Sequence, residues 1–241
     1  MRLNNRSPLE MREISFEVNY TKQAHGSCLV KIGNTWVLCT ASIEDKVPPF
    51  LRNTGKGWIT AEYSMLPGST SERVMREVVK GKQNGRTLEI QRLISRSLRA
   101  SITLELLGER MIVVDCDVLQ ADGGTRTAAI NGGYVALQIA IRSLNKAGLI
   151  HKLPFMRHVA AVSCGIVNGQ LLVDLDYPED SNADVDANFI YTSDGKFVEV
   201  QLTGEKNTFD QEAILSMLNA SKAACTTIID KQKEAIAAAV A

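Results

Sequence analysis

The passage over residues 115–127 constrains the fold of this chain more than any other stretch of its sequence. The run over 111–119 is typical of a buried strand, and the apolar run over 127–149 is typical of a long helix. Between them lie Gly123-Gly124 and Arg126. Glycines let the backbone approach a ligand closely, and the free amides and dipole at a helix start favour an anion. Because a guanidinium is a planar donor suited to phosphate, the sequence predicts a strand, an anion-binding loop and a helix.

A plainer interpretation of the glycine pair stays open, because two glycines before a helix often form only a tight turn. Asp122 could also cap the helix, a structural role that is compatible with an anion site. The position of the loop between a strand and a helix favours the anion site, and so does the adjacent arginine.

The stretch Gly81–Thr87 is a second glycine-containing cationic loop that opens a helix, with Thr87 as its expected cap. Lys82 and Arg86 could bind the same anion or a neighbouring backbone phosphate. Alone, this stretch would be interpreted as a solvated loop. Two such loops in one chain favour a phosphate site.

Length and charge narrow the class of protein. A chain of 241 residues forms one large domain or two small ones. The 27 basic and 27 acidic residues cancel, so no overall basic field indicates nucleic acid, although a local basic patch stays compatible with this balance. The sequence has no apolar run of membrane-spanning length and no signal-like N-terminus. We therefore expect a soluble cytoplasmic protein with no membrane partner.

The cysteines and histidines follow no metal-binding or catalytic spacing, which disfavours a zinc site. We expect buried thiols in a reducing compartment for the five cysteines, Cys28, Cys39, Cys116, Cys164 and Cys225. We expect structural or surface roles for His25, His151 and His158. Since no Ser-His-Asp or Cys-His pattern is visible, an enzyme built on this chain would activate an outside nucleophile, either water or phosphate.

The hydrophobic pattern predicts strands grouped in hairpins and followed by helices. Short β-rich runs and their turns place strands at 28–32, 35–43, 57–64, 111–119, 159–167, 170–176, 187–192 and 197–202. Apolar periodicity places helices at 87–107, ended by Gly108, and at 127–149. A last helix is expected from Thr208, where Thr208 and Gln211 fit a capping box. A loop with one helical turn is expected over 68–84. Because the strands and helices are grouped rather than strictly alternating, the order predicts an α+β domain with helical layers on mixed sheets.

Arginines gather between residues 73 and 99, at Arg73, Arg76, Arg86, Arg92, Arg96 and Arg99. The last three recur on one helix face. For Arg96 and Arg99 we expect a solvated face, or a salt-bridged subunit interface with Glu89 and other acids. Arg73 and Arg76 lie on a polar segment, where their charge suits contact with an RNA backbone.

Carboxylates gather between residues 174 and 186, at Asp174, Asp176, Glu179, Asp180, Asp184 and Asp186. We expect them on a turn between two hairpins. Hard carboxylates close together suit Mg²⁺, which takes one or two protein carboxylates and leaves room for water and substrate phosphate. A plain acidic surface loop is the alternative. Cationic phosphate loops and a carboxylate pair in the same chain together predict phosphoryl transfer.

The sequence resembles the bacterial ribonuclease PH family of phosphate-dependent exoribonucleases. The resemblance covers nearly the whole chain through long motifs, which are Asn19–Lys22, Val37–Ser42, Gly57–Tyr63, Gly81–Gln83, Gly85–Thr87, Glu89–Ile94, Asp115–Ala128, Ala160–Ser163, Gly165–Gly169 and Glu179–Ser181. It implies a ribonuclease PH-like fold with two βαβ-like halves, forming a single domain over residues 1–241. It also implies a homo-hexamer, arranged as a trimer of dimers.

The resemblance implies an activity as well. Inorganic phosphate, as co-substrate, attacks the last phosphodiester of an RNA and releases a nucleoside diphosphate, and the reverse reaction adds nucleotides. The implied substrates are tRNA precursors, trimmed beyond the 3′ CCA end, together with other structured RNA 3′ ends and ribosomal RNA.

The matching motifs carry implied site residues. Phosphate is held by Arg86, Gly124, Thr125 and Arg126, and Mg²⁺ is held by Asp180 and Asp186, so that the two arginines and the two carboxylates are the catalytic set. Arg73 and Arg76 match a segment that contacts tRNA or builds the ring, and Lys82 and Arg92 are further candidate RNA contacts.

The chain departs from the family pattern outside the phosphate loops, at Leu9, Met11, Ala187–Phe189 and Leu202–Asn207. We expect these changes to alter packing beside the metal site more than catalysis. Two other functions stay open, an inactive ring subunit that only binds RNA and a nuclease that uses water. The retained arginines and carboxylates favour the phosphate-dependent enzyme.

Overall fold

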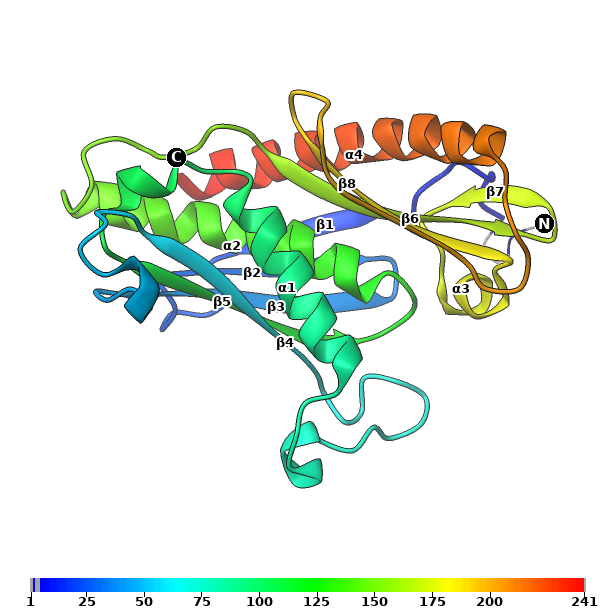
Figure 1. The fold of residues 1–241 in the computed structure, drawn as a ribbon, viewed down its shortest axis with the longest axis horizontal. Coiled ribbons are helices and arrows are strands. Elements are labelled where there is room, and N and C mark those ends of the chain that lie inside the picture. The colour runs from blue at the N-terminus through cyan, green and yellow to red at the C-terminus, as the bar shows by residue number, and fades with distance from the viewer. Residues whose placement is uncertain (1, 3–4, 241) are drawn as a thin grey trace.

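The expected strand-to-helix passage is present as β5 (Met111–Gln120) and α2 (Thr125–Lys146) in the computed structural model, which describes residues 2 and 5–240 (Figure 1). β5 alternates between buried and half-buried residues, as a strand inside a sheet does. Most of the 22 residues of α2 are buried. A helix that is apolar on nearly all sides must be covered on nearly all sides, so α2 lies between layers.

The first half of the chain forms a five-stranded sheet in the order β1-β2-β3-β5-β4. The other strands are β1 (Ile14–Val18), β2 (Gly26–Ile32), β3 (Thr35–Glu44) and β4 (Trp58–Met65). Neighbouring strands are antiparallel except β4 and β5, which are parallel and are connected through α1 (Gly85–Arg99). β4, α1 and β5 therefore form the βαβ unit expected in this half.

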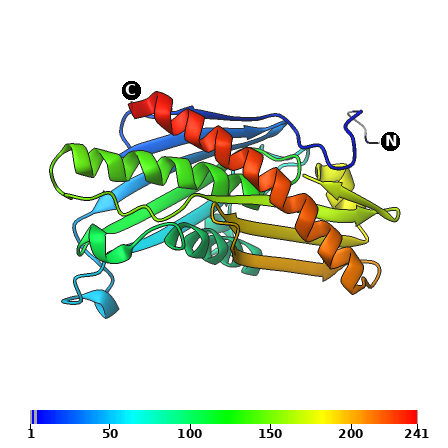
Figure 2. The same ribbon diagram turned by 90° about the horizontal axis from the view of Figure 1, so that it is seen from above.

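The second half forms a four-stranded antiparallel sheet in the order β7-β6-β8-β9. Its elements are β6 (Val159–Val167), β7 (Gln170–Val173), α3 (Tyr177–Asn182), β8 (Val185–Thr192) and β9 (Phe197–Gly204). Because β7 and β8 flank β6, the unit β7-α3-β8 is a split βαβ. α4 (Gln211–Val240) runs along this sheet and extends over β1 (Figure 2).

α2 is the layer that both halves share. It lies in one apolar cluster with β2, β3 and β5 and with Val159, Ala161 and Ile190 of the second sheet. Gly26 on β2 shows how closely the helix approaches, because a Cβ there would lie 2.2 Å from the carbonyl oxygen of Ala136. Glycine is therefore required at this crossing of strand and helix.

A smaller apolar cluster joins β6 and β8 to α4 around Phe189, Met217 and Ile228. Phe189, which departs from the family pattern, is fully buried in it, and Leu202 packs against it. The departures at these two positions therefore fill the second core.

The helix predicted over 87–107 is too long. α1 ends at Arg99, and a separate 3-10 helix, η3 (Leu104–Leu107), follows before Gly108. Between them Ile102 forms a β-bridge with Phe155, and the amide of Thr103 donates to the carbonyl of Pro154 at 2.8 Å. A partner about fifty positions away thus ends the helix, and local periodicity does not report such a partner.

The predicted helix starts also need correction. Asn84, rather than Thr87, caps α1, since its side chain accepts from the amide of Thr87 at 2.7 Å. α2 begins at Thr125 after Gly124, so Asp122 is not its cap. α4 begins at Gln211, where Asp210 accepts from the amide of Ala213 at 2.8 Å in place of the predicted capping box.

Three elements were not predicted, the 3-10 helix η1 (Pro49–Leu51), β1 and α3. β1 is a five-residue edge strand, too short for a strong alternating signal. α3 replaces the expected acidic turn, with Asp176 and Glu179 forming a capping box around Pro178. The four hairpin strands of the second half are confirmed, although β7 ends at Val173 rather than at Asp176. The loop over 68–84 with one helical turn, η2 (Glu77–Lys80), is also confirmed.

All five cysteines lie within the described residues, and all are buried and unpaired, as predicted. No helix in residues 2 and 5–240 combines the length and the apolar character that crossing a bilayer requires.

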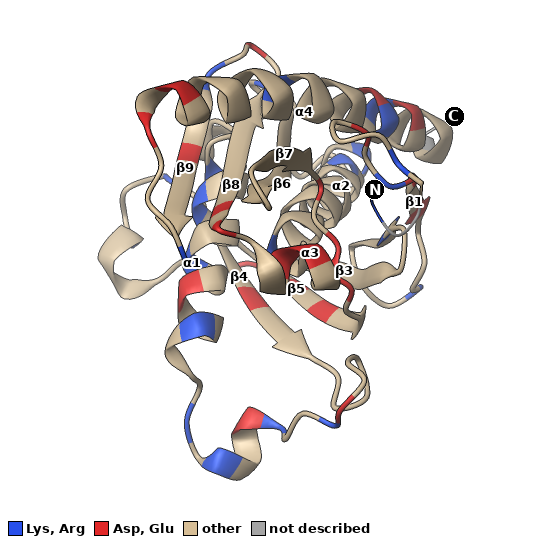
Figure 3. Ribbon diagram, turned by 90° about the vertical axis from the view of Figure 1, so that its right-hand side faces the viewer, with Lys and Arg blue, Asp and Glu red and all other residues tan. Residues whose placement is uncertain are grey.

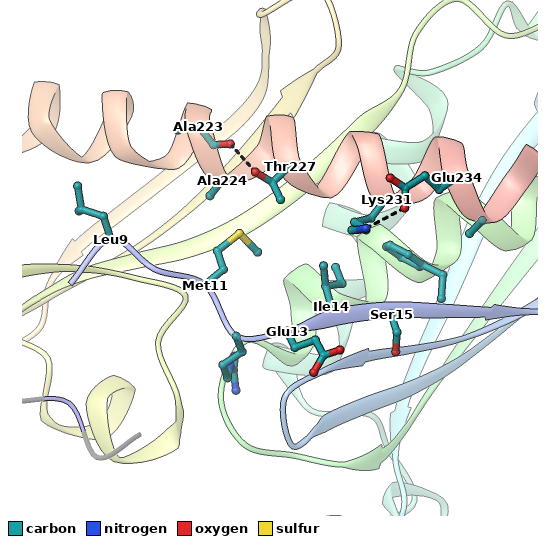
Figure 4. A pocket seen from close by; sticks show the side chains of 13 residues that line it. Leu9, Met11, Glu13, Ile14, Ser15, Ala223, Ala224, Thr227, Lys231 and Glu234 are labelled. Atoms are coloured by element: carbon teal, nitrogen blue, oxygen red, sulfur yellow. Dashed lines mark hydrogen bonds and ion pairs between the residues drawn. The ribbon is translucent and has the colours of Figure 1, made fainter. Parts of the chain in front are cut away.

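A hollow of about 750 Å³ lies between α4 and the side of β1 that faces it (Figure 4). Its walls are Met11 and Ile14 on one side and Ala224 and Thr227 on the other, and the ion pair of Lys231 with Glu234 borders it. Small side chains on α4 leave this space open.

Candidate active site

The loop between β5 and α2 has the backbone that an anion site needs. Gly123 and Gly124 both adopt left-handed φ angles, 73° and 67°, which favour glycine. Gly124 is the N-cap of α2 and has no side chain with which to cap it. The first amides of α2 therefore keep their donors, and the helix dipole adds partial positive charge at this end. Thr125 and Arg126 lie in the first turn of the helix itself.

Gly123 packs directly against the second half of the molecule. A Cβ at this position would lie 2.4 Å from the carbonyl oxygen of Leu175 and 2.7 Å from the carbonyl carbon of Asp176. Asp176 is the N-cap of α3, the helix that carries Asp180. The loop before α2 and the start of α3 are therefore in backbone contact.

Arg12 holds the same two segments together. Its guanidinium binds the carboxylate of Asp174 at 2.7 and 2.9 Å and also donates to the carbonyl of Asp122. Thr35 adds a hydroxyl that donates to the carbonyl of Gly123 at 2.6 Å. Arg12 and Asp174 are both buried, so each depends on the other for its charge partner. Sequence reasoning missed Arg12, because its partner lies 162 positions later in the chain.

The acidic stretch divides into two groups. Three of its carboxylates pair with arginines near the N-terminus, and the contacts join Asp174, Asp176 and Glu179 to Arg2, Arg6 and Arg12. Arg2 holds both oxygens of Glu179 at 2.6 Å. Burial acts to raise the pKa of Glu179, but the hydrogen bonds from Arg2 and from the backbone of Asp176, together with the charges of Arg2 and Arg6, outweigh burial and lower it. These three carboxylates form a structural ion-pair network, so neither a single magnesium cluster nor a plain acidic loop describes the stretch.

Asp180 on α3 and Asp186 on β8 face the arginines of the two helix starts. Burial raises the pKa of Asp180, while the positive charges of Arg86 and Arg126 oppose that rise. Burial, followed by the charge of Asp180, raises the pKa of Asp186 to about 6, again against the two arginines. The four predicted catalytic side chains thus lie within electrostatic reach of one another. Figure 3 views the molecule from the side that carries α3, and α1 lies farther from the viewer.

Tyr63 on β4 lies near Arg86 and Arg126, two of these four side chains. Its hydroxyl lies 2.8 Å from Oγ1 of Thr125, and this buried hydrogen bond fixes the first turn of α2 against the sheet. Burial raises the pKa of Tyr63, so the phenol stays neutral. Tyr63 falls within a motif that resembles the family, yet sequence reasoning gave it no role.

A hollow of about 690 Å³ opens beside Arg86. One wall is formed by β4 and β5, and the other by the segment over 66–84. Three of the predicted phosphate or RNA contacts, Arg76, Lys82 and Arg86, line it. Arg73 and Arg92 lie outside it and are exposed. The structure therefore brings three of these five cations around one hollow.

The expectation of a solvated face is confirmed for Arg96, which is exposed, and is wrong for Arg99, which is half-buried. Arg96 pairs with Glu199 of the same chain at 2.8 Å. Arg99 places its guanidinium over the ring of Trp58, 4.3 Å from the ring centroid, and donates to the carbonyl of Ile59 at 2.8 Å. Both arginines thus support the packing of α1 within the chain, through contacts that distant sequence positions provide.

Asp180 and Asp186 supply the donors that a hard divalent cation prefers. The charge of Asp180 helps raise the pKa of Asp186, and a cation between them would relieve this repulsion. Within the described part of the chain, no group of three or more His, Cys, Asp or Glu side chains is arranged to hold a metal ion. A pair of carboxylates fits Mg²⁺, which completes its shell with water and substrate phosphate.

The fold has two halves, and the uncapped start of α2 lies within electrostatic reach of a carboxylate pair, an arrangement that suits phosphoryl chemistry. Residues 10–142 match domain 1 of the RNase PH type in the 3′ exoribonuclease family, and residues 158–224 match domain 2. The chain therefore belongs to the 3′ exoribonuclease family. This match confirms the family and the ribonuclease PH-like fold, and it does not single out the bacterial members.

Solved structures share the fold at low sequence identity. Rice (Oryza sativa) Rrp46 is 20% identical with a TM-score of 0.78, and the match covers 98% of this chain and 100% of that one. A chain of the Archaeoglobus fulgidus exosome with RNA bound to the active site is 22% identical with a TM-score of 0.82, over 95% and 92% of the two chains. A chain of an archaeal exosome core is 21% identical with a TM-score of 0.77, over 96% and 91%.

Proposed function

We propose that this protein is a phosphate-dependent 3′-to-5′ exoribonuclease. The observation that carries the proposal is the convergence of Arg86, Arg126, Asp180 and Asp186 at the uncapped start of α2. Arginines and free amides suit inorganic phosphate, and a carboxylate pair suits a cation beside a phosphodiester. Membership of the 3′ exoribonuclease family supports RNA as the polymer.

In the proposed reaction, phosphate bound by Arg86, Arg126 and the amides after Gly124 is the nucleophile. One of its oxygens bonds to the phosphorus of the last phosphodiester, and the bond from that phosphorus to the 3′-oxygen of the preceding nucleotide breaks. The proton of hydrogen phosphate ends on this 3′-oxygen, so atoms and charges balance and a nucleoside diphosphate leaves. Because positioning and charge stabilisation dominate such reactions, two arginines at a helix start suffice to orient the nucleophile. The reverse steps add a nucleotide.

Mg²⁺ held by Asp180 and Asp186 is part of the proposal, and it would neutralise charge that develops at the scissile phosphate. Both carboxylates must be ionised to hold a cation. Since burial and the charge of Asp180 raise the pKa of Asp186 to about 6, the site is expected to lose Mg²⁺ affinity as the pH falls through this value.

We further propose tRNA precursors as substrates, together with other structured RNA 3′ ends, including those of ribosomal RNA. Arg76 and Lys82 would contact the RNA backbone from the hollow beside the phosphate site, and Arg73 and Arg92 from exposed positions outside it. A homo-hexamer, built as a trimer of dimers in the cytoplasm, would place six such sites in one particle. The shared fold with a chain from an exosome structure that has RNA bound to its active site supports RNA binding.

The reaction class is tested by incubating a tRNA precursor and a short unstructured RNA with Mg²⁺, with and without phosphate. We expect nucleoside diphosphates that appear only with phosphate, and faster trimming of the tRNA precursor. Monophosphates without phosphate would instead establish hydrolysis. No product under either condition would contradict the proposed activity and favour the alternative of an inactive ring subunit. Native mass measurement of the same sample tests the hexamer.

Arg126→Ala tests the phosphate site itself. Removing a preorganised donor to a reacting oxyanion costs on the order of 3 kcal/mol, so kcat/KM for phosphate should fall by about 10²–10³. Arg52→Ala removes an equal charge from an exposed position and serves as the matched control. Near-normal activity of Arg126→Ala at low phosphate would contradict the assignment.

A further inference from the structure

One nitrogen of Arg126 is engaged within the chain, and the rest of its guanidinium is available. Nη1 donates to Oε1 of Gln201 at 3.1 Å and to Oε1 of Glu89 at 3.4 Å. Nε and Nη2 have no hydrogen-bond partner among the described residues. The side chain is only 16% exposed, so these contacts fix its direction inside a largely enclosed space. Two donors of the guanidinium are thereby left for a ligand.

Gln201 on β9 is oriented by two carboxylates. Its Nε2 donates to Oε1 of Glu89 at 3.0 Å and to Oε1 of Glu199 at 3.1 Å. Because ionised carboxylates only accept hydrogen bonds, the amide nitrogen must face them and the amide oxygen must face Arg126. Gln201 therefore gives Arg126 an acceptor without adding negative charge beside it.

The two carboxylates differ in how their charges are balanced. Glu199 is bound by Nε and Nη2 of Arg96, each at 2.9 Å. Glu89, in the first turns of α1, has Arg126 as its ion-pair partner within the described residues, and it is 39% exposed. Glu89 is thus the carboxylate whose charge bears on Arg126, while that of Glu199 is neutralised by Arg96.

We propose that Gln201 and Glu89 are positioning residues for Arg126, and that Glu89 also competes with inorganic phosphate for that arginine. The inference rests on the proposed function, since phosphate is the competing ligand. Gln201 holds the guanidinium so that Nε and Nη2 meet the incoming anion. The contact of Glu89 with Nη1 is long and partly exposed, so its charge offsets part of the guanidinium charge that phosphate meets without occupying Nε or Nη2. This competition raises the phosphate concentration that the site requires.

Glu89→Gln separates the two roles of Glu89. The variant keeps an acceptor for Arg126 and Gln201 but removes the competing charge. Exposed ion pairs of this kind contribute little, so we expect the KM for phosphate to fall by about two- to fivefold, with kcat unchanged or lower. A residue that only supported the structure would raise the KM or leave it unchanged.

Gln201→Leu tests positioning. Leucine fills a similar volume but offers neither the acceptor for Arg126 nor the donors for the carboxylates. Loss of one such hydrogen bond predicts a KM for phosphate that rises by roughly three- to tenfold. The KM for RNA should change less than the KM for phosphate, because Gln201 contacts Arg126, the residue proposed to bind phosphate.

The measurements are initial rates against phosphate concentration at saturating RNA, for the full-length wild type and the variants. Glu212→Gln, an exposed and equal charge change on α4, is the matched control and should not alter either constant. Thermal unfolding of each variant verifies folding. A wild type that needs no phosphate would overturn the proposed function and this inference together. Normal phosphorolysis by the wild type, with an unchanged or raised KM in Glu89→Gln, would overturn the inference alone.

Discussion

Asp186 shows how a single residue links the candidate site to the stability of the fold. Its pKa is raised from an ordinary value of 3.8 to about 6 by burial and by the charge of Asp180. The folded protein therefore holds this proton more tightly than the unfolded chain does. It follows that the stabilising contribution of the protonated group is fully present below about pH 4 and is lost as the pH rises through about 6.

Asp186→Asn should therefore stabilise the protein at pH 7 while lowering its activity. The neutral amide avoids the burial and repulsion of the charge, so we expect the free energy of unfolding without divalent cations to rise by about 1–3 kcal/mol. At pH 5 the gain should be roughly half as large, because the unfolded chain still ionises this carboxyl there while the folded protein mostly does not. Urea unfolding in EDTA at both pH values measures this. Asp45→Asn, at a carboxylate that is 86% exposed, is the control. If the free energy of unfolding of Asp186→Asn at pH 7 were equal to or lower than that of the wild type, the ionised carboxylate of Asp186 would not destabilise the fold.

At the residue scale, the sequence identified the four side chains that come together at the candidate site but not the residues that contact them. Residue type and helix starts were sufficient to single out Arg86, Arg126 and the Asp180–Asp186 pair. The sequence could not separate Asp174 or Glu179 from that pair, because carboxylates close in sequence differ only in which distant arginine reaches them. Gln201 was invisible for the same reason, since its role depends on groups that lie on α1 and α2.

At the scale of elements, the junction, which is the contact between the loop at Gly123 and the start of α3, sets the distance between the start of α2, where we propose that phosphate binds, and Asp180. The backbone of Leu175 and Asp176 occupies the space where a side chain at 123 would lie. Arg12 supplies the ionic part of the junction through Asp174. Because both contacts are buried, a shift at this junction should appear in both stability and activity.

Gly123→Ala tests the junction, with Gly169→Ala as its matched control. Both glycines have nearly the same left-handed φ, 73° and 74°, but at Gly169 nothing lies within 4 Å of an added Cβ. Alanine should therefore cause the same backbone strain at both positions and a steric clash only at 123. We expect Gly123→Ala to lose about 1–3 kcal/mol more stability than Gly169→Ala and to raise the KM for phosphate. Equal losses in the free energy of unfolding, measured in urea, would mean that the backbone around residue 123 shifts to accept the alanine at no further cost.

Element boundaries were predicted well where local signals decide them and poorly where tertiary contacts do. The hairpin strands of the second half follow Asn-Gly and Asp-Gly turns, and the structure has them. The end of α1 is set by the bridge between Ile102 and Phe155, which no local pattern reports. β1 is a strand mainly because β2 pairs with it. Long-range pairing therefore accounts for what sequence periodicity missed.

At the scale of the whole molecule, the two halves do not have separate cores. The main apolar cluster contains Val159, Ala161 and Ile190 of the second sheet and Ile236 of α4, all packed with the first sheet through α2. The candidate site lies across the same boundary, with its arginines from one half and its carboxylates from the other. Because separating the halves would expose α2, we expect a single cooperative unfolding transition.

Thiol labelling in urea tests this expectation, because the buried cysteines are distributed over both halves. Cys39 and Cys116 lie in the first core, and Cys164 and Cys225 lie in the second. A thiol reagent followed by peptide mass analysis reports the midpoint of exposure at each site from one sample. We expect the four midpoints to coincide, with slow labelling in native buffer. Earlier exposure of Cys164 and Cys225 would show that the second half opens first. In that case the carboxylates would leave the arginines before the fold is lost, and activity should disappear at the lower midpoint.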